Sequence, residues 1–348
     1  GAAGEKRKGF ERGQAFGEDE DLRAIPGLCL RSGNTPPRPL LDLTDLPFPY
    51  EDLSCFDNRI LYYESSRGCP YRCSYCLSSV DKTVRLKSIS MVKRELQVFL
   101  DRSVRQVKFT DRTFNCCHDH AMEIWRYILE HDNGVTNFHF EIAADILRED
   151  EIRLLSRARP GLIQLEIGVQ STNPETLKAV RRVTDLERLE KNTAALGQAG
   201  NVHRHLDLIA GLPYEDYESF RNSFDRVYRM KPEQLQLGFL KVLKGSYLYE
   251  RRVAYGLVYF DNPPYEVMQT NWISYDEILN IKLAEEMLEV YYNSGQFEVT
   301  MKLCDVVYPD AFAFYQKLGV YCEEHGYLSM QHTRIRRSEI LLEFLDTD

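Results

Sequence analysis

Short β-rich runs alternate with helix-like stretches between residues 59 and 242, and this alternation constrains the fold more than any other feature. Six runs are rich in strand-forming residues: 59–64, 104–109, 137–143, 162–169, 203–209 and 234–242. Strands that alternate with helices form parallel sheets through right-handed crossovers. Because six units are too few to close an eight-stranded barrel, we expect an α/β fold, an open, partial (β/α)6 TIM-like barrel whose chemistry lies at the carboxyl ends of its strands.

Helices are expected between these strands, and the intervening sequence has the corresponding apolar periodicity. The expected ranges are 88–101, 118–131, 149–157, 174–197 with a break near Thr184, and 217–229. The fourth strand, "LIQLEIGVQ", is apolar almost throughout. We therefore expect it to be buried on both faces.

The alternation stops near residue 245, where a mostly helical unit is expected. "SYDEILNIKLAEEMLEVYYNSG" predicts a long helix that ends at Gly295, and "DAFAFYQKLGVYCEEHGY" predicts another that Gly326 ends. Five prolines between residues 36 and 49 are typical of an extended linker. We therefore expect three parts: the tail of an upstream domain plus linker (1–50), the barrel (51–244) and the helical unit (245–348).

Charge and cysteine content narrow the classes of protein. The formal net charge of −9 argues against a general nucleic-acid binder, which needs a surplus of Lys and Arg. No apolar run approaches the roughly 20 residues that cross a bilayer, and no signal peptide opens the chain, so we expect a cytoplasmic protein without a membrane contact. Nine cysteines, three of them clustered, suit a reducing compartment and a metal or redox role.

The three clustered cysteines follow the first predicted strand in "GCPYRCSYC", as Cys69, Cys73 and Cys76. A structural zinc site needs four protein ligands, so zinc would require a distant fourth ligand. A 4Fe–4S cluster held by three cysteines instead leaves one iron with an open coordination site. The CxxxCxxC spacing favours the iron–sulfur cluster, with a zinc-stabilised binding module as the alternative.

This loop, with Tyr75 before the third cysteine, resembles the radical S-adenosylmethionine (SAM) superfamily. The resemblance implies that the amino and carboxylate groups of SAM chelate the open iron. It further implies that an electron from the cluster cleaves SAM into methionine and a 5′-deoxyadenosyl radical, which takes a hydrogen atom from the substrate. It also implies a flavodoxin- or ferredoxin-type electron donor.

Later segments resemble the branch that contains oxygen-independent coproporphyrinogen oxidases and cobalamin-dependent members. They include "FTDRTFN", "FEIAAD", "EIGVQST" and "DLIAGLPYED". Residues that match SAM contacts of that branch are Tyr63, Asp111, Glu141, Gln170, Arg182 and Asp207. The usual Gly-Gly-Glu is absent near Asp111, and Arg181 competes with Arg182.

Segments from about residue 36 onward resemble a bacterial subgroup with an N-terminal cobalamin-binding domain, a radical SAM core and a C-terminal domain of unknown function. The first residues resemble the end of the cobalamin domain, so we expect this chain alone not to hold cobalamin well. The implied function is a radical SAM enzyme acting on a small molecule or peptide, with C-methylation as a candidate reaction in the full-length form. A cobalamin-independent porphyrinogen-type oxidase is the alternative.

Two further groups stay open. "FNCCHDH" places Cys116, Cys117, His118 and His120 within five residues, either as a second site or as the start of a helix. His203 and His205 alternate with apolar residues on the fifth strand, where one could face the barrel interior. No motif in the sequence identifies the substrate.

Overall fold

The structure is a computed structural model that describes residues 22–56, 58–81 and 83–347. These residues form two compact units that divide between Leu46 and Pro47. The first unit contains the 3₁₀ turns Leu22–Ala24 and Leu43–Asp45 and the antiparallel pair β1 (Cys29–Leu30) and β2 (Gly33–Asn34). Residues 1–21, the greater part of the predicted upstream tail, lie outside the described residues. Within the described part, no helix is long and apolar enough to span a membrane.

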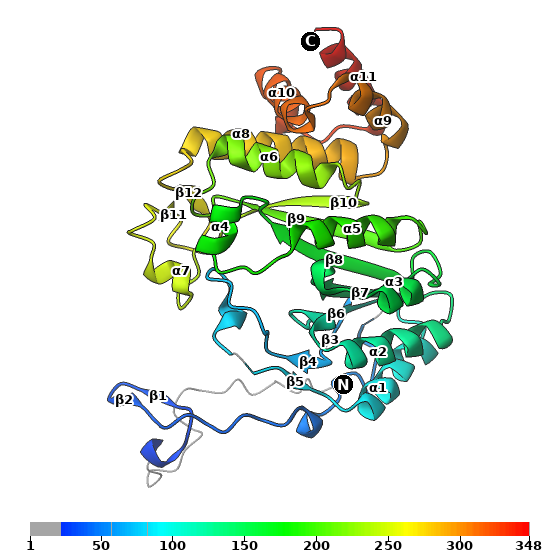
Figure 1. Cartoon of the computed structure of the whole chain (residues 1–348), viewed down its shortest axis with the longest axis vertical. Helices are drawn as coiled ribbons and strands as arrows, with labels where there is room; N and C mark the ends of the chain where they lie inside the picture. Colours follow the sequence, from blue (N-terminus) through cyan, green and yellow to red (C-terminus); the bar gives the residue numbers. More distant parts are fainter. Residues whose placement is uncertain (1–21, 57, 82, 348) are drawn as a thin grey trace, which may run out of the picture. The chain divides into compact units, whose positions relative to one another are not determined.

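The second unit is built on a six-stranded sheet in which every neighbouring pair is parallel. The strands are β3 (Leu61–Tyr63), β6 (Gln106–Phe109), β7 (Asn137–Ile142), β8 (Ile163–Gln170), β9 (His203–Ala210) and β10 (Gln234–Phe239). They lie side by side in sequence order, with β3 and β10 at the two edges (Figure 1). The sheet is therefore open, and the predicted partial (β/α)6 barrel is confirmed.

Helices follow the strands, and most of them cover the outer face of the sheet (Figure 1). They are α1 (Ile89–Asp101), α2 (His118–Glu130), α3 (Glu149–Leu155), α4 (Pro174–Ala179), α5 (Leu186–Gly197) and α6 (Tyr217–Tyr228). The predicted break near Thr184 separates α4 from α5. Asp185 causes the restart, because its side chain accepts a hydrogen bond from the Arg188 backbone N–H at the start of α5.

The two faces of the sheet differ, and one prediction about them is wrong. On β8, Ile163, Leu165, Ile167 and Val169 are buried on the helix side, whereas the alternate residues are half-buried. The expectation that this strand is buried on both faces fails because the barrel is open. The strand is apolar on one face only, and its Gln164 and Glu166 belong to the polar inner face.

The C-terminal helices belong to the same compact unit as the sheet. After β10 come α7 (Tyr247–Glu250), the pair β11 (Val258–Tyr259) and β12 (Val267–Gln269), α8 (Tyr275–Leu288), α9 (Glu298–Val307), α10 (Ala311–Glu324) and α11 (Arg334–Leu345). The two predicted helices are α8 and α10, and Gly295 and Gly326 beyond them have φ of 65° and 71°. Gly319 lets α10 approach α8 closely, because a Cβ there would lie 2.8 Å from the Leu283 carbonyl oxygen.

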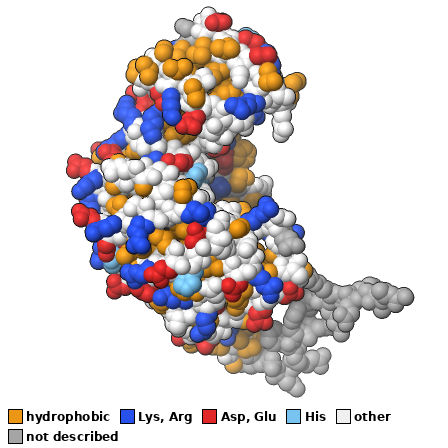
Figure 2. Space-filling view, turned by 90° about the vertical axis from the view of Figure 1, so that its right-hand side faces the viewer, with side chains coloured by type: hydrophobic (Ala, Val, Ile, Leu, Met, Phe, Trp, Pro, Cys, Tyr) orange, Lys and Arg blue, Asp and Glu red, His pale blue; other side chains and the backbone are white. Residues whose placement is uncertain are grey.

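The α8 helix continues as a π-helix over Glu289–Asn293, and this turn covers the edge strand β10. The Leu235 backbone N–H donates to Asn293 Oδ1 at 3.0 Å, and Asn293 Nδ2 donates to the Leu235 carbonyl at 2.8 Å. The Asn293 side chain thus pairs the backbone N–H and carbonyl of Leu235. Unpaired groups on an edge strand can otherwise form hydrogen bonds with a strand of another chain. Positive and negative side chains are interspersed over the face shown in Figure 2, and apolar ones gather at its top.

Candidate functional site

The three-cysteine loop leaves the carboxyl end of β3 and is closed by a short antiparallel pair. β4 (Ser66–Arg67) precedes it, and β5 (Arg85–Leu86) follows the 3₁₀ turn Leu77–Ser79. Gly68 starts the loop with φ of 100°, and a Cβ there would lie 2.1 Å from the Thr83 carbonyl oxygen. Only glycine fits this close approach, so the sequence Gly-Cys fixes how the loop begins.

The loop is held from both sides by backbone hydrogen bonds to distant segments. The Ser74 N–H donates to the Val180 carbonyl at 2.8 Å, and the Leu248 N–H donates to the Ser74 carbonyl at 2.8 Å. Cys69 and Cys73 are buried, and Cys76 is half-buried. The end of α4 and α7 therefore fix the backbone between Cys73 and Cys76.

Arg182 lies beside Cys73, and Gln170 lies close to Arg182 at the end of β8. Arg182 Nη1 lies 3.8 Å from Cys73 Sγ, and its Nη2 donates to the Gly168 carbonyl. A Cβ on Gly168 would lie 2.3 Å from Gln170 Nε2, so the glycine makes room for this amide. Arg181, the competitor, is instead exposed and stacked on Tyr247.

Two buried polar atoms of this group have no partner within the described residues: Gln170 Oε1 and Arg182 Nε. Gln170 also has φ of 73°, an uncommon conformation for a residue with a side chain. Buried polar groups without partners are costly. A donor on Arg182, beside Cys73, and an acceptor on the nearby Gln170 fit a bound polar ligand.

Asp111 and Tyr63 make internal contacts instead. Asp111 is fully buried and accepts hydrogen bonds from Ser65 N, Ser65 Oγ and Ser66 Oγ at 2.6–2.9 Å. Burial raises its pKa to about 6, although these hydrogen bonds oppose the rise. The Tyr63 hydroxyl donates to Glu95 at 2.6 Å on the helix side of the sheet. Both side chains hold the strand that leads into the cysteine loop.

Glu141 and Asp207 lie on the polar inner face of the barrel. Burial, followed by the charge of Glu166, raises the pKa of Glu141 to about 7. Asp207 Oδ1 lies 3.1 Å from His205 Nε2, and burial raises the pKa of Asp207. Of the two histidines left open on this strand, His205 is thus the one engaged with a carboxylate.

Lys108, His139 and Glu166 join this inner face, and sequence reasoning missed them. Glu166 Oε2 accepts from Lys108 Nζ at 3.0 Å and lies 2.8 Å from His139 Nε2. The hydrogen bond to His139 is the main reason that the pKa of Glu166 falls to about 2. Strand register was the signal that could have revealed this group, because Lys108 pairs with His139. Both residues alternate along their strands with core residues.

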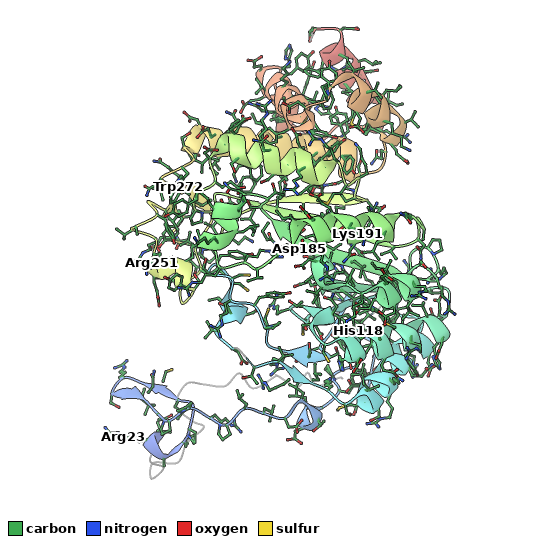
Figure 3. All side chains as sticks on the ribbon, viewed as in Figure 1. Arg23, His118, Asp185, Lys191, Arg251 and Trp272 are labelled. Atoms are coloured by element: carbon green, nitrogen blue, oxygen red, sulfur yellow. The ribbon has the colours of Figure 1, made fainter. Side chains whose placement is uncertain are left out.

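The "FNCCHDH" segment links two strands. Asn115 exchanges two 2.9 Å hydrogen bonds with the Ala143 backbone and so ties the end of β6 to the end of β7. His118 starts α2 and lies 3.1 Å from Asp150 (Figure 3). Burial raises the pKa of Cys116 to about 11, with smaller contributions from Cys117 and then from Cys69.

The donor set can be compared with the two metals considered. Among residues 22–56, 58–81 and 83–347, no group of three or more His, Cys, Asp or Glu side chains could hold a single metal ion. The arrangement therefore gives no support to zinc, which gathers its ligands at about 2.0–2.3 Å. An iron–sulfur cluster fits better, because each thiolate binds a different iron.

Two family models match the chain. Residues 63–227 match the radical SAM superfamily, and residues 253–348 match a protein family of unknown function, DUF4080. The first range contains the cysteine loop and strands β3 to β9. The second contains the C-terminal helices.

Curated relatives are similar over parts of their length. The cobalamin-dependent radical SAM methyltransferase TokK of Streptomyces tokunonensis is 25% identical over 58% of this chain and 33% of its own length. An uncharacterised methyltransferase of Pyrococcus horikoshii is 22% identical over 77% and 59%, respectively. The oxygen-independent coproporphyrinogen III oxidase of Salmonella typhimurium is 26% identical over 58% and 42%. The chain thus spans less than two thirds of each relative.

Solved structures share the fold. The radical SAM methyltransferase TsrM of Kitasatospora setae, with cobalamin and a [4Fe-4S] cluster bound, has a TM-score of 0.50 at 19% identity over 59% of this chain and 41% of its own. The cobalamin-dependent SAM radical enzyme OxsB has a TM-score of 0.50 at 18% identity over 67% and 36%.

Proposed function

We propose that this chain is an enzyme of the radical SAM class, which binds a 4Fe–4S cluster through Cys69, Cys73 and Cys76 and SAM at the iron without a thiolate. When bound, such a cluster supplies the electron that cleaves SAM to methionine and a 5′-deoxyadenosyl radical. The observation that carries the proposal is the group at the end of β8, where Arg182 lies beside Cys73 and holds the Gly168 carbonyl, and Gln170 lies against Gly168. Gln170 and Arg182 each have a buried polar atom without a hydrogen-bond partner among the described residues.

In this proposal, different residues contact the cluster, contact SAM or support the cysteine loop. The Arg182 guanidinium places positive charge beside the Cys73 sulfur, where a thiolate would develop negative charge. Gln170 Oε1 offers an acceptor, and the Gly168 backbone leaves room for it. Glu141 and Asp207 offer carboxylates on the inner face to amino or hydroxyl groups of SAM. In this proposal Tyr75 covers the cluster, while Tyr63 and Asp111 support the loop from behind.

The reaction is proposed to be methyl transfer to carbon in the full-length protein. The relatives named as cobalamin-dependent methyltransferases support this subclass. Cobalamin would be held by an upstream domain, and the electron would come from a flavodoxin- or ferredoxin-type protein. The chain alone should lose added hydroxocobalamin on gel filtration, and stoichiometric retention would refute that division of labour.

Anaerobic reconstitution tests the cluster. Iron and sulfide should approach four per chain, and each of Cys69→Ala, Cys73→Ala and Cys76→Ala should lower both. Cys304→Ala is the control, because Cys304 is buried in the C-terminal core. A full complement of iron in the three loop variants, or a colourless protein with one zinc, would overturn the proposal.

A further inference from the structure

Six side chains at the carboxyl edge of the sheet have no part in the proposed cofactor binding. We call them the aromatic–arginine surface: Arg181, Tyr214, Tyr247, Arg251, Tyr255 and Trp272. Arg181 and Tyr214 follow β8 and β9, and the others lie between β10 and α8. Arg251 and Trp272 lie on the side of the molecule that carries α4 and α7 (Figures 1 and 3).

Two positive charges gather on one ring of this surface. The Arg181 guanidinium carbon lies 3.5 Å from the Tyr247 ring centroid, and that of Arg251 lies 5.4 Å from it. Arg251 Nε also donates to the Tyr247 hydroxyl at 3.1 Å. Within the described residues neither arginine forms an ion pair with a carboxylate, whereas Arg67 on the cysteine loop pairs with Glu64. The two guanidinium charges repel each other, and cation–π contacts at exposed sites offset only about 0.5–1 kcal/mol each. A bound anion would therefore relieve the repulsion between the two arginines.

The aromatic part is built from two tightly joined turns. The Tyr214 and Trp272 ring centroids are 4.4 Å apart, and those of Tyr255 and Trp272 are 5.9 Å apart. The Asn271 N–H donates to the Tyr255 carbonyl, and a Cβ on Gly256 would lie 2.0 Å from Asn271 Oδ1. Tyr214 is nevertheless 44% exposed. The cluster is therefore open to solvent at Tyr214, whereas the Tyr255 and Trp272 rings are half-buried.

Backbone strain marks the same surface. Arg181 has φ of 56° and Tyr214 has φ of 65°, conformations that cost residues with side chains free energy. Asn173 Nδ2 holds the Tyr214 carbonyl at 3.0 Å. Strain that is held in place by hydrogen bonds on the surface of an enzyme is typical of binding sites.

The surface is also joined to the cysteine loop. Leu248, next to Tyr247, donates its N–H to the Ser74 carbonyl between Cys73 and Cys76. Val180, next to Arg181, accepts from the Ser74 N–H. Residues next to Arg181 and next to Tyr247 are therefore bonded to the backbone between two of the proposed cluster ligands.

We propose that the aromatic–arginine surface binds the substrate, and that the substrate carries a carboxylate or phosphate beside a flat, unsaturated ring. Arg181 and Arg251 take the anion, and Tyr214, Tyr255 and Trp272 take the ring. The inference rests on the proposed function, because it places the substrate next to the cluster loop. It also gives a role to the first residues of the C-terminal region of unknown function.

Calorimetric titration of the reconstituted chain with benzoate and phenyl phosphate tests this. Both probes should bind more tightly than benzyl alcohol, and the tighter of the two identifies the anion. Arg181→Gln and Arg251→Gln should each weaken binding about tenfold, as expected for a lost charge-assisted hydrogen bond, and Trp272→Leu should weaken it too. Arg252→Gln is the matched control, because Arg252 lies over Tyr249 instead.

SAM cleavage in the absence of substrate separates this inference from the proposed function. Wild type and all four variants should form 5′-deoxyadenosine at the same rate, so a loss of probe binding alone supports the surface. No saturable binding of either probe in the millimolar range, or equal binding by wild type and both glutamine variants at 181 and 251, would overturn the inference. Absence of cluster and cleavage in wild type would count against the proposed function instead.

Discussion

At the scale of single residues, what decided each role was the direction of the side chain. Arg182 turns toward Cys73, whereas the Tyr63 hydroxyl points to Glu95 among the helices. Position near a strand end could be read from the sequence by resemblance. The facing direction could not, because one residue of register reverses it and the irregularity between Gly168 and Gln170 lies at the decisive point.

Arg182→Gln should slow SAM cleavage by roughly tenfold or more, because it removes a charged donor beside Cys73. The measurement is the rate of 5′-deoxyadenosine formation per reconstituted cluster. Lys178→Gln, on the exposed face of α4, is the control and should cleave at the wild-type rate. Equal rates in both variants would remove Arg182 from the site.

Glu215 should make stability depend on pH. Its carboxyl is buried and accepts from Ser171 and Ser223, and burial raises its pKa to about 8 from an ordinary 4.5. The native state therefore holds a proton that the unfolded state has lost, so stability falls as pH rises from about 4.5 to 8.

Glu215→Gln keeps the shape without this proton, so it should gain on the order of 2 kcal/mol over wild type at pH 8 relative to pH 5. Denaturant unfolding at the two pH values measures the difference. Glu187→Gln, exposed on α5, should show none. Identical pH dependence of Glu215→Gln and wild type would contradict the assignment.

At the scale of elements, short-range patterns were reliable where caps and turns enforce them. The break before α5 and the ends after α8 and α10 followed from a polar cap and from glycines. The burial of β8 could not be read from its composition, because an open barrel gives one strand two different faces. α9 and α11 were not predicted as separate helices.

Gly68→Ala should prevent the cysteine loop from closing, because the new Cβ would lie 2.1 Å from a backbone oxygen. Iron content should fall to a small fraction of wild type, together with the melting temperature. Gly134→Ala shares the positive φ but has open space around it, so it should cost about 1 kcal/mol and keep its iron. Full iron loading of Gly68→Ala would show that the loop adapts.

Asn293→Ala should loosen the edge strand β10. It removes two hydrogen bonds from the Leu235 backbone, so the free energy of unfolding should fall by about 1–3 kcal/mol. Hydrogen exchange at the Leu235 amide should accelerate. Gln296→Ala, an exposed truncation three residues away, should change neither quantity; unchanged exchange in Asn293→Ala would mean that other groups protect the edge.

At the scale of the whole molecule, alternation of strands and helices was enough to predict the open barrel, since each crossover is local. The cysteine spacing and the strand-end series identified the class of chemistry. The inner-face network of Lys108, His139 and Glu166 arises from the register of three strands, so no local pattern reveals it. The aromatic–arginine surface likewise joins segments from both sides of residue 245.

The central claim is that three thiolates leave one iron open and that SAM occupies it. The most direct measurement is the electron paramagnetic resonance spectrum of the reduced, reconstituted chain with and without SAM. The account predicts that SAM changes the cluster signal and that 5′-deoxyadenosine then accumulates. A 4Fe–4S signal that SAM leaves unchanged, with no 5′-deoxyadenosine formed, would contradict it.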